Sequence, residues 1–154
     1  MAFPYRKILC PINFDDNSLT AIHEAAAIAA HHAGTLTLLH VVHINPLVAQ
    51  GAAEGYAGAE LYEGQLQAAR DQVGQLLANL PQGMKPEIVV DIGDPAEVIL
   101  ATGVKLQADL VVMATHGRTG LARIVMGSVT DKIVRGSHVP VLTLLPPAHD
   151  THSH

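Results

Sequence analysis

The sequence predicts one α/β domain with an open, parallel, Rossmann-like sheet of five strands and helices on both faces. Short segments rich in Val, Leu and Ile alternate along the chain with segments of helical period, a pattern typical of parallel strands joined by crossover helices. A length of 154 residues is usual for one domain, and a hydrophobic fraction of 49% is enough for a continuous core. Aromatic residues contribute only 3%, so that core must be aliphatic, as in a sheet buried on both faces.

Five apolar segments are expected to form the strands, and polar, Gly or Pro residues bound them. They are residues 7–12, 35–42, 87–91, 109–114 and 139–145. Right-handed crossovers wind such a chain to one side of the first strand and then back to the other, which predicts the strand order 3-2-1-4-5. Ligands of such sheets bind at the carboxyl ends of the strands where the winding reverses. The expected site therefore lies between the first and fourth strands.

The first two helices are expected in the amino-terminal half of the chain. The first begins among the polar residues 15–18 and ends at Gly34, a residue suited to the left-handed conformation past a helix end. The second covers residues 60–80, which carry one apolar stripe before Pro81. Between the second strand and this helix, residues 44–58 show no clear period. We expect them to form a mobile connection that covers a bound ligand.

The start of each later helix carries a capping signal. Asp94, Pro95 and Glu97 fit the cap, the first and the third positions of the third helix. Ser128 and Asp131 have the spacing of a capping box, which predicts the start of the fourth helix near Ser128.

Charge and hydropathy exclude several classes of function. The net charge of −5 and the absence of any Lys or Arg block give no attraction to nucleic acid. No run approaches the ~20 apolar residues that span a bilayer, and Pro11 and Asn13 interrupt the first apolar segment too soon for a signal peptide. We therefore expect a cytoplasmic protein that binds no membrane. Cys10 is the only cysteine, so neither a disulfide framework nor a CxxC pair is present.

A glycine-bearing loop follows the fourth strand. It starts after Ala114, contains Gly117 and reaches Gly127 just before the fourth helix. Glycines let the backbone approach a ligand closely, and the free N–H groups at a helix start attract anions. Because the loop lies where the winding reverses, we expect it to bind phosphate. Arg118 lies within it and can neutralise phosphate charge.

In this loop nine residues separate Gly117 from Gly127, which is followed by Ser128. This spacing resembles the glycine motif of ATP-binding members of the universal stress protein family, although Ala114 replaces the first glycine of that motif. The resemblance covers nearly the whole chain. It includes Lys-Ile-Leu-Cys-Pro at 7–11, Leu-His-Val at 39–41, Gly-Asp-Pro at 93–95 and Val-Pro-Val-Leu at 139–142.

The resemblance implies a bound adenine nucleotide, namely ATP, ADP or AMP, with or without Mg²⁺ or Mn²⁺. The cofactor-binding residues that it implies are Pro11, Ile12, Asn13 and Val41 around the nucleoside, and Ala114, His116, Gly117, Arg118, Gly127, Ser128, Val129 and Thr130 around the ribose and phosphates. Relatives usually carry Asp at the position of Asn13. The amide can form hydrogen bonds but brings no charge to a metal or a ribose.

Histidines are frequent, but they predict no metal site. His40 and His43 are three residues apart on one strand and therefore point to opposite faces. The remaining cluster lies at residues 148–154, which we interpret as a polar His-rich tail after a domain of residues 1–147.

Three functions are compatible with these features. The first is a regulatory adenine-nucleotide-binding protein, whose stress-response role is implied by the resemblance. The second is a nucleotide-independent dimeric interaction module, and the third is a slow ATPase. No Walker motif, nucleophile elbow or paired carboxylate occurs near the expected site, so no catalytic residue is assigned. The last strand, from Val139 to Leu145, is an apolar sheet edge with few charges and predicts a homodimer.

Overall fold

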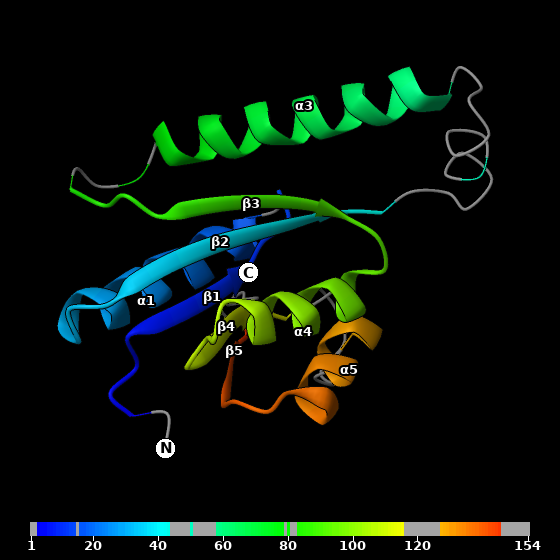
Figure 1. Cartoon of the computed structure of the whole chain (residues 1–154). Coiled ribbons are helices and arrows are strands. Elements are labelled where there is room, and N and C mark those ends of the chain that lie inside the picture. The colour runs from blue at the N-terminus through cyan, green and yellow to red at the C-terminus, as the bar shows by residue number, and fades with distance from the viewer. Residues whose placement is uncertain are drawn as a thin grey trace, which may run out of the picture.

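The computed structural model describes residues 3–14, 16–43, 50, 58–78, 80, 83–115 and 127–145. The five strands are β1 (Lys7–Pro11), β2 (Thr35–Val42), β3 (Glu87–Ile92), β4 (Leu110–Ala114) and β5 (Val141–Leu144). They form one all-parallel sheet in the order β3-β2-β1-β4-β5 (Figure 1). The predicted strand order and fold class are confirmed.

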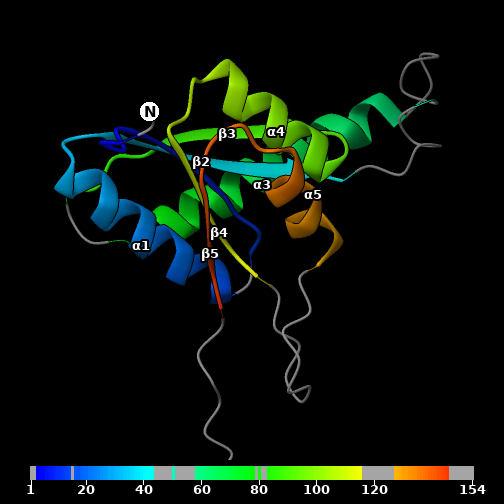
Figure 2. The ribbon, with the colours of Figure 1, turned by 90° about the horizontal axis from the view of Figure 1, so that it is seen from below.

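Two layers of helices enclose this sheet. Helices α1 (Asp16–His31) and α3 (Gly58–Ala78) cover one face, whereas α4 (Pro95–Lys105) and α5 (Ser128–Gly136) cover the other (Figures 1 and 2). Successive residues of a strand point to opposite faces of the sheet and so pack against the two helix layers in turn. Ile8, Cys10, Leu38 and Val112 pack toward α1 and α3, while Leu9, Leu39, Val111 and Met113 pack toward α4 and α5. This alternation is the reason that each strand reads as a continuous apolar run.

The end of α1 differs from the expectation. Ala33, not Gly34, takes the left-handed conformation, with φ of 52°. The amides of Ala33 and Gly34 donate to the carbonyl oxygens of Ala30 (3.4 Å) and Ala29 (2.8 Å), which is the Schellman pattern. Gly34 is needed for another reason, because a Cβ there would lie 2.7 Å from the Cα of Arg6. The glycine marks a close approach of two backbone segments.

The last strand is shorter than expected. Val139 lies outside the β4–β5 ladder because Ser137 holds it in a local turn. The Ser137 hydroxyl donates to the Val139 carbonyl (2.7 Å) and accepts from the Val139 amide (3.2 Å). The strand therefore begins only at Val141.

Candidate functional site

The carboxyl ends of β1, β2 and β4 lie at one edge of the sheet, where the winding reverses. Helix α5 runs from this edge back to the opposite one, so its first residue lies on the same side as the end of β4 (Figure 2). Of the residues proposed for nucleotide binding, this edge carries Pro11, Ile12, Asn13, Val41, Ala114, Gly127, Ser128, Val129 and Thr130. His116, Gly117 and Arg118 lie outside the described residues, as do residues 44–49 and 51–57 of the predicted cover and the predicted tail.

The turn after β1 is fixed by its own polar groups. The amide of Asn13 donates to Oγ of Ser18 (3.0 Å), and that hydroxyl donates to Oδ1 of Asn13 (2.7 Å). Ser18 is buried, so this pair ties the turn to the first turn of α1. The oxygen of the Asn13 amide thus points to α1. The side chain that the turn presents here is neutral.

His40 lies on β2 beside this turn and holds it from the other side. Its Nδ1 is 2.9 Å from the carbonyl oxygen of Ile12, and its ring is 4.4 Å from that of Phe14, centroid to centroid. In the part of the chain described, no three His, Cys, Asp or Glu side chains form a group that could hold a metal ion. The contacts of the His40 side chain given above are thus with Ile12 and Phe14 of this turn.

The end of β4 is secured by Thr115, a residue that sequence reasoning missed. Its backbone amide and its hydroxyl both donate to the carbonyl oxygen of Leu144, at 2.9 and 3.1 Å. Thr115 is only 2% exposed, and it is the residue directly after Ala114, with which the glycine loop starts. The feature of the sequence that could have identified Thr115 is its hydroxyl group directly after an apolar strand. Its two hydrogen bonds fix the position from which the loop departs.

The start of α5 corrects the capping prediction. Gly127 is the N-cap residue, with φ of −59° and ψ of 158°, and it has no side chain with which to cap the helix. Ser128 is already the first helical residue, while Asp131 forms an ion pair with Arg135 (2.9 Å). At α4, by contrast, Asp94 caps as predicted, because its Oδ2 accepts from the Glu97 amide (3.1 Å). The N-cap residue of α5 thus offers no side-chain acceptor to the first amides of the helix, whereas the N-cap residue of α4 does.

Cys10 lies in β1 one residue before the site, but its thiol is unsuited to chemistry. The side chain is fully buried, and burial raises the pKa of the Cys10 thiol to about 12. The reactive thiolate is therefore suppressed at neutral pH. Cys10 is therefore a packing residue of the core.

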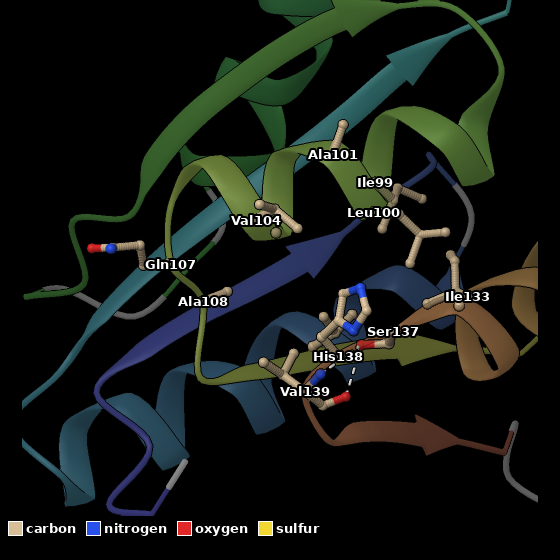
Figure 3. A pocket seen from close by; sticks show the side chains of 13 residues that line it. Ile99, Leu100, Ala101, Val104, Gln107, Ala108, Ile133, Ser137, His138 and Val139 are labelled. Carbon is tan, nitrogen blue, oxygen red and sulfur yellow. Dashed lines mark hydrogen bonds between the residues drawn. The ribbon is translucent and has the colours of Figure 1, made fainter. Parts of the chain in front are cut away.

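A separate cavity of about 330 Å³ lies between α4 and α5, shown in Figure 3. It is lined mainly by apolar side chains, among them Leu100, Val104, Ile133 and Val139, and His138 points into it (Figure 3). It lies by the carboxyl-terminal ends of both helices, and so at the sheet edge opposite Gly127. This cavity and the candidate site are distinct places in the fold.

The fold defines an α/β protein with a Rossmann-like parallel sheet, in which the direction of winding reverses between β1 and β4. Residues 4–144 match the family model described as the universal stress protein family. The chain therefore belongs to the universal stress protein family, as its resemblance to this family predicted.

Relatives of similar length support this assignment. Universal stress protein MJ0531 of Methanocaldococcus jannaschii is 34% identical, over 93% of this chain and 84% of its own. Universal stress protein MJ0577 of the same organism is 27% identical, over 94% of this chain and 97% of its own. A solved structure of MJ0577 superposes with a TM-score of 0.77 at 26% identity, covering 94% of this chain and 99% of that one. Among the described residues, no helix is both long and apolar enough to cross a membrane.

Proposed function

We propose that this protein is a regulatory adenine-nucleotide-binding protein of the stress response, which acts in the cytoplasm and uses ATP, ADP or AMP as a ligand. The observation that carries the proposal is the start of α5. Its N-cap is a glycine without a side chain, and it lies at the sheet edge where ligands of this fold bind. Amides at such a helix start, together with the helix dipole, form an anion site.

Two further observations support the proposal. The first intrahelical bond of α5 runs from the Asp131 amide to the Gly127 carbonyl (3.0 Å). The amides of Ser128, Val129 and Thr130 precede this bond and have no partner within the helix, which is the arrangement that binds phosphate at helix starts. A universal stress protein of this fold, 20% identical with a TM-score of 0.59, has been solved in complex with cAMP. The fold thus accommodates an adenine nucleotide in another protein.

Gly127→Leu should lower the affinity for ATP at least about tenfold, which corresponds to ~1.4 kcal/mol, because its side chain would occupy the space in front of the helix start. A Cβ at Gly127 meets no described atom within 4 Å, so the variant should fold. Gly127→Ala, with one methyl group, is the matched control and should bind far better than Gly127→Leu. Titration calorimetry of the wild type and both variants measures these affinities for ATP. Equal affinities in folded proteins would remove the helix start from the site.

The identity of the nucleotide is accessible without a variant. Freshly purified protein should release an adenine nucleotide on denaturation, which mass spectrometry identifies. A protein that carries none and binds none at millimolar concentration would instead be the nucleotide-independent interaction module.

We further propose that the nucleotide is a ligand and not a substrate. Fast phosphoryl transfer needs a held metal and a group that positions water. Asn13 brings no charge, and its Oδ1 already accepts from Ser18. With Mg²⁺ or Mn²⁺, phosphate release in single-turnover experiments should be far slower than about one per second. A rate of that order that is lost in Ser128→Ala would make the protein an enzyme.

We also propose a homodimer through β5, which pairs only with β4 among the described strands. The Pro140 carbonyl accepts from Val111 of β4, and the Leu144 carbonyl accepts from Thr115 directly after β4. Val141 and Thr143 therefore direct their backbone groups to the open edge. Thr143→Pro removes one outward donor and leaves the β4 side intact. Light scattering should then report a dimer for the wild type and a monomer for the variant. A wild-type monomer at high concentration would contradict the proposal.

A further inference from the structure

The imidazole of His40 extends the connection between β1 and β2 beyond the end of their backbone ladder. The register of the two strands ends at the pair Pro11 and Leu39. One residue further on, the Ile12 amide donates to the Leu39 carbonyl (2.8 Å), and Nδ1 of His40 lies 2.9 Å from the Ile12 carbonyl oxygen. A carbonyl oxygen can only accept, so Nδ1 carries the hydrogen. Both backbone groups of Ile12 are thus bonded to β2.

The same imidazole also contacts the turn two residues later. The ring of Phe14 lies 4.4 Å from the His40 ring, with an angle of 42° between their planes. Phe14 is 40% exposed, so His40 provides a packing surface for a side chain that is otherwise partly in solvent. Between these two contacts, Asn13 is held by Ser18. Three consecutive residues of the turn are each fixed by a specific partner.

We infer that His40 is a positioning residue, which sets the backbone of residues 12–14 for contact with the nucleoside. The inference rests on the proposed function, because Ile12 and Asn13 are among the residues proposed to surround the nucleoside. His40 itself acts through the Ile12 carbonyl and not through the ligand. Loss of its donor should loosen the turn and raise the entropic cost of ordering it around a nucleotide.

The test separates the hydrogen bond from the volume of the side chain. In His40→Asn, Nδ2 is attached to Cγ as Nδ1 is in His, so the donor stays in place. In His40→Gln the same amide is one bond further from the backbone. His40→Phe keeps a ring against Phe14 but has no donor. A net hydrogen bond of ~1 kcal/mol corresponds to about a fivefold change in affinity. We expect that loss in His40→Phe and His40→Gln, and an affinity within about twofold of wild type in His40→Asn.

Amide hydrogen exchange of Ile12 and Asn13 in the nucleotide-free protein tests the inference independently of nucleotide binding. Exchange at both amides should be faster in His40→Gln and His40→Phe than in the wild type, and His40→Asn should restore protection. If the wild type binds no nucleotide but these amides respond as stated, the proposed function fails and the positioning role stands. Unchanged exchange in His40→Gln, or equal effects of Asn and Gln on exchange, would overturn the inference. If His40→Phe does not fold, the comparison of His40→Asn with His40→Gln still tests the inference.

Discussion

Gly34→Ala is expected to destabilise the protein by about 3 kcal/mol, the upper part of the usual range for overpacking. The added Cβ would lie 2.7 Å from the Cα of Arg6 and 2.8 Å from its carbonyl carbon, and both are backbone atoms. The segment cannot easily withdraw. The amide of Thr35 donates to the Arg6 carbonyl (2.6 Å), and the amides of Arg6 and Lys7 donate to Oδ2 of Asp109 (3.1 and 2.9 Å).

Ala33→Gly is the matched control at the neighbouring position, and we expect it to raise the free energy of unfolding instead of lowering it. Ala33 has φ of 52°, where a Cβ is unfavourable and glycine is not. Relief of this strain should exceed the larger chain entropy that glycine gives the unfolded state, for a net gain of about 0.5 kcal/mol. Urea denaturation of both variants measures the free energies of unfolding. A neutral Gly34→Ala variant would show that Arg6 and Gly34 are not in close contact.

Raising the pH from about 9 to 12 should destabilise the wild type through Cys10 by up to about 1.4 kcal/mol per pH unit. Burial raises the pKa of this thiol from 9.0 to about 12. In that window the unfolded thiol ionises while the folded thiol stays protonated. The unfolded state therefore binds fewer protons, so the free energy of unfolding falls as the pH rises and is unaffected by this group below about pH 9.

Cys10→Ala provides the control, because any pH dependence that does not arise from the thiol remains in the variant. The variant is less stable throughout because it leaves a small cavity, but its stability should depend less steeply on pH above 9. Urea denaturation gives the slope of the free energy of unfolding against pH for each protein. The difference between the two slopes is the contribution of the thiol. The native thiol should also resist alkylation until the protein unfolds. Parallel slopes together with rapid alkylation of native protein would contradict the burial of Cys10.

Local sequence signals determined the order of elements and several of their ends. Apolar segments alternating with helical periods, combined with right-handed crossovers, were enough to predict the order β3-β2-β1-β4-β5. The start of α4 was equally predictable, because Asp94 bonds the amide of Glu97, only three residues away. The spacing of Gly117 and Gly127 led to the family, to which residues 4–144 belong. In each case the determinant lies within a few residues or in a pattern along the chain.

Only the tertiary structure decided the features that depend on segments far apart in the sequence. Gly34 looked like a helix terminator, yet its role is set by the backbone of Arg6 on the neighbouring segment. The cap of α5 is Gly127 and not Ser128, because Ser128 is already the first helical residue. The sequence assigned no role to His40, yet its side chain bonds Ile12, 28 residues away. Sequence periodicity encodes which face of an element is buried, but it contains no information on which backbone atoms meet when the elements pack.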